Sequence, residues 1–164
     1  MLRRLTEAAV LGGWWLSQTT DDPDLTRQLW RQGPLAEIPV GIRFNIIRMS
    51  SDLGRAAIED MQSAGLPQGP VLLDHSNCRC DWLVTIRPTQ VWGMRGTELL
   101  TGPGTGSGTE ALTVPMPVPG VGRVDHLEWL VEPDGTGLLT RPEDLAVAIR
   151  RSRERLRQPT ATVP

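Results

Sequence analysis

The densest group of reactive side chains lies between residues 74 and 81. Two thiols, an imidazole and two carboxylates fall within this segment: Asp74, His75, Cys78, Cys80 and Asp81. These side chain types bind zinc, but a closed zinc site needs four ligands that converge. A hairpin sends alternate side chains to opposite faces, and the nearest other histidine, His126, is far along the chain. We therefore expect no metal site, with a metal at His75, Cys78 and Cys80 as the less favoured alternative.

Other arrangements that could support catalysis are scarce. The chain contains two histidines and no lysine, which excludes a Walker A phosphate loop and Schiff-base chemistry. The glycine-rich segment from Gly102 to Thr109 has neither a GK[ST] nor a GxGxxG pattern, so it is interpreted as a surface connection. These observations favour a protein that lacks catalytic residues and needs no cofactor.

Arginine supplies every cation of the chain, 17 in all, against 19 acidic residues. Residues 148–158 carry a net charge of +4, which leaves −6 for residues 1–147. The five arginines of that segment are Arg150, Arg151, Arg153, Arg155 and Arg157. One interpretation is a solvated helix end that is favoured by the helix dipole. The other is a patch that binds nucleic-acid phosphates or an acidic protein surface.

The elements that must position these side chains follow from hydrophobic spacing, caps and turn residues. Helices are predicted over residues 5–16, 22–32, 51–64 and 141–158, the last one opened by a capping box at Thr140 to Glu143. Strands are predicted over residues 38–49, 69–74, 81–86, 111–114 and 127–131. This order indicates an α+β fold with helices packed on a mixed or antiparallel sheet.

A series of short landmarks runs along about residues 10–145. They are Thr19–Leu25, Leu29–Trp30, Ile38–Gly41, Gly41–Asn45, Gly69–Val71, Leu112–Pro115 and Trp129–Gly135. In this order they resemble segments of the bifunctional DNA primase/polymerase (prim-pol) domain of the archaeo-eukaryotic primase superfamily, including its short actinobacterial forms. The resemblance implies one prim-pol-like domain over residues 1–147, followed by the basic end of the last helix and a disordered tail at 148–164.

The chain departs from the family where the resemblance would place its catalytic residues. No D-x-D occurs at Ile46–Ser50, no histidine matches the family's Ser-x-His segment near Ser76–Cys80, and Glu98 is the only acid at 96–102. Two-metal catalysis needs such acids to hold the metal ions. The resemblance thus implies a catalytically degenerate module. We expect its cleft to bind a nucleotide or nucleic-acid phosphate through Arg43, Asn45, Arg48, His75 and Arg79.

Two alternatives remain open. The protein would be an adaptor if the arginine-rich last helix docks a partner protein, or if an exposed Trp14/Trp15 face does so, since adjacent tryptophans cannot both face inward. The least favoured alternative is a residual metal-dependent enzyme. No stretch approaches the ~20 apolar residues that span a membrane, and we expect a cytoplasmic protein without membrane contact.

Overall fold

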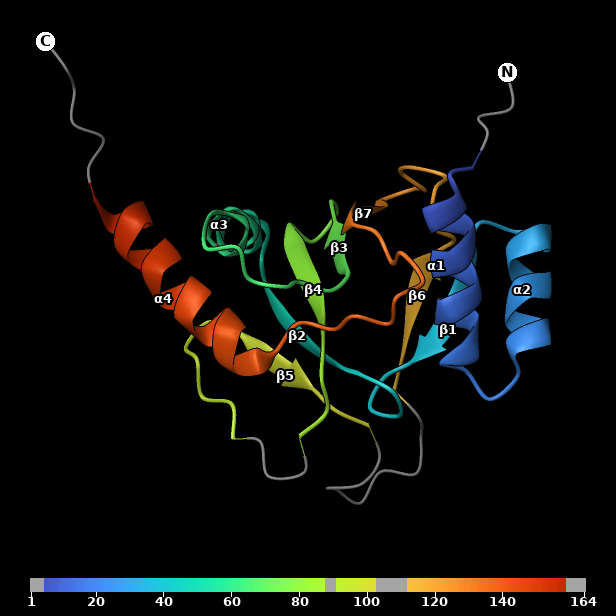
Figure 1. Ribbon diagram of the computed structural model, residues 1–164, viewed down its shortest axis with the longest axis horizontal. Helices are drawn as coiled ribbons and strands as arrows, with labels where there is room; N and C mark the ends of the chain where they lie inside the picture. The colour runs from blue at the N-terminus through green and yellow to red at the C-terminus, as the bar shows by residue number, and fades with distance from the viewer. Residues whose placement is uncertain (1–4, 88–90, 103–111, 159–164) are drawn as a thin grey trace, which may run out of the picture.

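A five-stranded antiparallel sheet runs through the middle of the computed structural model, which describes residues 5–87, 91–102 and 112–158 (Figure 1). The strand order is β5-β2-β4-β3-β7. These strands are β2 (Asn45–Ser50), β3 (Val71–Asp74), β4 (Arg79–Val84), β5 (Glu98–Leu100) and β7 (Leu127–Val131). A separate antiparallel pair joins β1 (Leu35–Pro39) to β6 (Thr113–Pro117). The predicted α+β fold is confirmed, and its named strands all pair antiparallel.

The described residues form four helices: α1 (Glu7–Gln18), α2 (Pro23–Gln32), α3 (Ser51–Ser63) and α4 (Pro142–Arg157). Of these, α3 and α4 lie on one side of the large sheet and α1 and α2 lie on the other side, where α2 packs on α1 and β1 (Figure 1). In the view of Figure 1, α3 and α4 lie to the left of the sheet, while β1, β6, α1 and α2 lie to the right. Within the described ranges, no helix has the length and apolar character that crossing a membrane requires.

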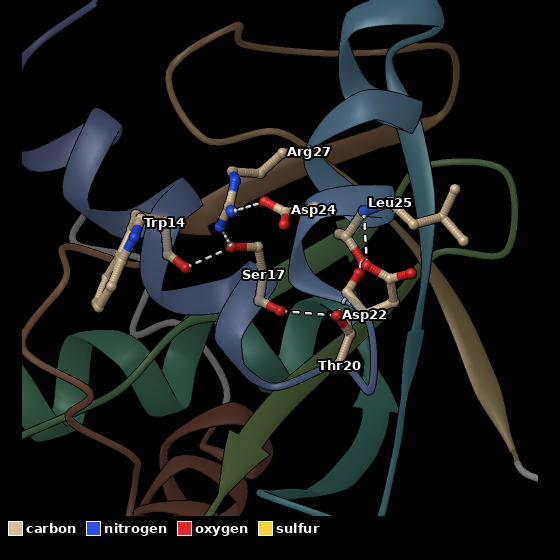
Figure 2. Close-up of polar contacts among 8 residues, drawn as sticks. Trp14, Ser17, Thr20, Asp22, Asp24, Leu25 and Arg27 are labelled. Carbon is tan, nitrogen blue, oxygen red and sulfur yellow. Dashed lines mark hydrogen bonds and ion pairs between the residues drawn. The ribbon is translucent and has the colours of Figure 1, made fainter.

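Side-chain caps begin two of the helices where the sequence predicts them. The Asp22 carboxylate accepts a hydrogen bond of 3.0 Å from the Leu25 amide at the start of α2 (Figure 2). The Ser50 hydroxyl accepts one of 3.4 Å from the Leu53 amide at the start of α3. The predicted capping box at Thr140 is wrong. The buried Thr140 hydroxyl accepts from the Gly69 amide at 2.8 Å instead, and α4 begins without a side-chain cap.

The single strand predicted over residues 38–49 is two strands in two sheets. Gly41 has φ +90°, a left-handed conformation that favours glycine. A Cβ atom there would lie 1.9 Å from the Gly102 amide nitrogen. The turn at residues 40–44 therefore lets β1 pair with β6, while β2 pairs with β4 and β5 inside the large sheet.

Strand alternation divides the interior into two hydrophobic cores. On β4, Cys80, Trp82 and Val84 face α3 and α4, whereas Leu83 packs with β1, β6 and α1 on the other face. Asp81 and Arg79 share the parity of Leu83, so the second face changes from apolar to charged along the strand. This change creates the site described below.

The predicted boundary at residue 147 falls inside α4. Ala148 and Ile149 are fully buried and pack in the same core as the strands and α3. The basic end of the helix is therefore attached to the domain through its own apolar face. Residues 159–164, where a disordered tail is predicted, lie outside the described residues.

Candidate ligand-binding cleft

A cleft of about 460 Å³ opens on the charged end of the large sheet, between that sheet and the start of β6. Strand register aligns its charges in two rows. Glu98 of β5, Arg48 of β2 and Asp81 of β4 are direct neighbours across three strands. In the next row, Arg79 of β4 lies opposite Asp74 of β3. Acidic and basic side chains thus alternate across the cleft.

Arg48 is held rigidly in the first row. Its Nε donates to Asp81 Oδ1 at 2.8 Å, and its Nη2 donates to Asp81 Oδ2 at 2.9 Å. The side chain of Asp81 is only 6% exposed. The hydrogen bonds to Asp81 raise the pKa of Arg48 against the opposing effect of burial, and the charge of Glu98 adds to the rise. The guanidinium is therefore the internal counterion of these carboxylates.

The second row is held less tightly. Asp74 accepts hydrogen bonds from the Asn77 amide nitrogen at 3.1 Å and from its side chain at 2.7 Å. Burial alone would raise the pKa of Asp74, but these hydrogen bonds and the charge of Arg79 outweigh it and lower the pKa. Arg79 approaches Asp74 only to 3.4 Å through Nη2, its side chain is 35% exposed, and its Nε is buried without a hydrogen-bond partner among the described residues. Arg79 thus retains unused hydrogen-bonding capacity.

The carboxylates of the cleft do not form a metal site. Within the part of the chain that the structure describes, no three His, Cys, Asp or Glu side chains are placed to hold a metal ion. The two arginines explain this arrangement, because Arg48 stands between Asp81 and Glu98, and Arg79 lies beside Asp74. A divalent cation shared by these acids would compete with a guanidinium that already neutralises them.

Of the five cleft residues predicted from the sequence, the structure brings Arg48 and Arg79 together. Arg43 lines a separate hollow beside α1. Asn45 is buried and has the strand parity of Ile47, which places it on the opposite face. His75 bonds through Nε2 to Glu128 Oε2 at 2.7 Å. The prediction grouped these residues because the resemblance places the family's cleft at their two segments, whereas strand alternation and turns separate them.

Sequence reasoning did not assign Asp81 to the cleft, although Asp81 is the residue that fixes Arg48. It had grouped Asp81 with the thiols. The available signal was parity, since Asp81 lies two residues from Arg79 on one strand and must share its face. The pairing of Asp81 with Arg48, 33 residues away, becomes visible only in the register of β2 and β4. His126 also lines the cleft.

The alternative metal site at His75, Cys78 and Cys80 is not assembled. Cys80 is fully buried in the core under α3, where desolvation raises its pKa to about 12. Cys78 is exposed on the β3–β4 turn. A thiol with such a raised pKa disfavours the thiolate that zinc needs, and the two sulfur atoms belong to different environments.

The arginines of α4 do not all face solvent freely. Arg151 and Arg155 lie 3.6 and 3.4 Å from the carboxylate oxygens of Asp60 on α3. Arg153 donates to the Arg95 carbonyl. Arg150 and Arg157 form no ion pair with any described residue. The basic segment is therefore divided between α3 and the surface.

The two adjacent tryptophans separate as predicted. Trp14 is 56% exposed, whereas Trp15 packs against the core that the large sheet forms with α1, β1 and β6. Figure 2 shows the Trp14 indole lying away from the polar contacts that join α1 to α2. In those contacts, Ser17 donates to the Trp14 carbonyl at 2.7 Å and accepts from Arg27 at 3.0 Å, while Arg27 also pairs with Asp24. Residues 103–109 of the glycine-rich segment lie outside the described residues.

Comparisons of the chain with protein-family models, curated proteins and solved structures produced no match. The resemblance to prim-pol domains therefore rests on the sequence landmarks and remains a prediction.

Proposed function

We propose that this protein is a non-catalytic, prim-pol-like binding module whose cleft takes a nucleotide or a short single-stranded nucleic acid through one phosphate. The observation that carries the proposal is the state of Arg79. This guanidinium lines the cleft, is one-third exposed, and makes one contact of 3.4 Å with Asp74. Arginine binds phosphate oxygens through paired N–H groups, so a ligand phosphate would use the capacity that the protein leaves open.

The cleft charges limit how many phosphates such a ligand can carry. The cleft contains three carboxylates and two guanidiniums: Asp74, Asp81 and Glu98 against Arg48 and Arg79. Arg48 already donates two hydrogen bonds to Asp81, so it has fewer N–H groups left for an incoming anion. Each further phosphate would meet a cleft in which carboxylates already exceed guanidiniums, and like charges repel strongly in a partly desolvated cleft. We therefore expect a nucleoside monophosphate, or one phosphodiester of a strand, to bind better than a triphosphate.

The absence of catalysis is proposed on the geometry of Arg48. Phosphoryl transfer by the two-metal route needs carboxylates that share divalent cations with the substrate. Here Arg48 bonds both carboxylate oxygens of Asp81 and adjoins Glu98. The cleft would thus bind its ligand without Mg²⁺.

Isothermal titration at low salt with adenosine, AMP, ATP and a short oligo-dT, each with and without Mg²⁺, tests this function. Arg79→Ala is expected to weaken AMP binding by about tenfold or more, as for loss of one charge-assisted contact. Arg43→Ala removes an exposed arginine from a different hollow and is the matched control, with an expected change of less than about twofold. Absence of binding by every probe, or Mg²⁺-dependent nucleotide incorporation, would refute the proposal.

A further inference from the structure

A second surface hollow lies away from the cleft, between α4 and the segment that connects β4 to β5. It measures about 830 Å³. One wall is the first half of α4, with Ala146, Val147 and Arg150, and the other includes Val91, Trp92 and Met94. We infer that this groove, together with the arginines that continue along α4, binds an acidic amphipathic segment of another protein.

The wall opposite α4 is held in place by core packing and by hydrogen bonds. Trp92 and Met94 pack against the core under α3 and α4. The Trp92 indole donates to the Thr97 hydroxyl at 2.9 Å, and this hydroxyl donates to the Met94 carbonyl at 2.7 Å. Because its one polar group is satisfied within the wall, the Trp92 ring can contact an apolar ligand side chain without loss of a hydrogen bond.

The groove is apolar where a partner side chain would enter. Val91 is 94% exposed and Val147 is 38% exposed, on opposite walls. The carboxylate at this end is already paired, since Glu143 lies 3.3 Å from Arg87 and 4.0 Å from Arg141. An aliphatic anchor that fills the groove would remove these side chains from water, at roughly 25 cal/mol for each Å² of apolar area.

The charge changes sharply along the same side of α4. Arg150, Arg153 and Arg157 follow at spacings of three and four residues, so they continue the stripe that begins at Ala146. Glu154 is the acid nearest to this stripe in the helix. Arg151 and Arg155, which pair with Asp60, lie on the neighbouring side. Arg153 of this stripe donates to the Arg95 carbonyl, so the arginines that the stripe presents to solvent without an ion pair to a described residue are Arg150 and Arg157.

These two features together identify the chemistry of the partner. From Ala146 to Arg157 the helix extends about 18 Å, the length of about three helical turns. A segment with one or two aliphatic anchors followed by carboxylates would fill the groove and pair with the arginines. A nucleic-acid strand would meet the arginines but would leave Val91, Met94 and Val147 against a charged backbone, so the apolar wall favours protein.

The probe is a labelled peptide of about 14 residues in which leucines follow one another at alternating spacings of three and four residues and all other positions are glutamate. Its binding is measured by fluorescence anisotropy. Control ligands are the same peptide with serine in place of leucine and an oligo-dT of equal charge. Three protein variants are compared: Val91→Asp, Arg150→Glu and, on exposed α2 as a remote control with the same charge change, Arg31→Glu. The exposure of Val91 means that its substitution tests binding without disturbing the core.

We expect the leucine peptide to bind, and Val91→Asp and Arg150→Glu each to weaken binding by about tenfold or more. Arg31→Glu should change binding by less than about twofold. The inference is overturned if the serine peptide or the oligonucleotide binds as tightly as the leucine peptide, or if both groove variants bind normally. Self-association of the chain without peptide binding would also overturn it. AMP binding in the cleft should be unchanged in both groove variants, which separates this result from the proposed function.

Discussion

Replacing Arg48 with methionine tests whether this arginine is the internal counterion of the cleft. Methionine keeps an unbranched stem of similar length but carries no charge. Asp81, whose side chain is 6% exposed, would lose hydrogen bonds of 2.8 and 2.9 Å and remain largely buried as a carboxylate. The substitution therefore leaves an acid without its compensating charge in the middle of the sheet.

Removing one partner of a buried ion pair typically costs 3–5 kcal/mol. The Arg48 side chain is 21% exposed, so solvent screens part of this interaction. We expect a loss of about 3 kcal/mol in the free energy of unfolding. For a chain of this length, that loss corresponds to a fall in Tm of roughly 6–12 °C.

The assay is urea denaturation monitored by tryptophan fluorescence, with Arg48→Met, Asp81→Leu and the double variant compared in one double-mutant cycle. The double variant should recover most of the stability lost in Arg48→Met, because no carboxylate is then left unpaired. A loss below about 1 kcal/mol in Arg48→Met, or a double variant that is less stable than both single variants, would refute the counterion role.

Three further predictions concern packing, thiol reactivity and pH. Gly12→Ala should destabilise the fold by about 2 kcal/mol in thermal unfolding, because its Cβ would lie 1.8 Å from the Pro133 carbonyl oxygen. Gly13→Ala, whose nearest contact is 3.6 Å, should be neutral or stabilising by up to about 1 kcal/mol, and equal effects would contradict this packing. A disulfide reagent near pH 8 should modify only Cys78 in the native protein and both cysteines in denaturant, because burial raises the pKa of Cys80 to about 12. Rapid reaction of both thiols in the native protein would contradict the burial of Cys80. Asn77→Ala should cost about 2 kcal/mol near pH 7. Because the pKa of Asp74 is lower in the folded than in the unfolded protein, this stabilisation is present above about pH 4 and is lost as the pH falls through the folded-state pKa. The stability difference between Asn77→Ala and the unchanged protein should therefore shrink in urea titrations at acid pH. A difference that stays constant with pH would argue against this role of Asn77.

Most helices and strands could be predicted because their signals are local. Asp22 and Pro23 begin α2, Ser50 begins α3, and apolar spacing locates the hairpin of β3 and β4. The predicted strand over residues 38–49 and the capping box at Thr140 failed because distant contacts decided them. Gly41 turns the chain against Gly102, and Thr140 bonds to Gly69 across the core. The short strand β5 was not predicted, since three residues carry little periodicity.

The sequence alone determined the chemical inventory of this protein: a chain without lysine, two cysteines too few for a zinc site of their own, and a last helix with most of its positive charge at one end. It also determined the α+β class, since caps and periodicity depend on near neighbours. Only the tertiary structure decided which charges meet. Register joins Arg48 to Asp81 across 33 residues, and packing of α4 on α3 places Arg151 and Arg155 beside the one carboxylate of Asp60 while leaving Arg150 at the groove. The physical reason is that ion pairs depend on distances of a few ångströms, which strand register and helix packing set between residues far apart in the chain.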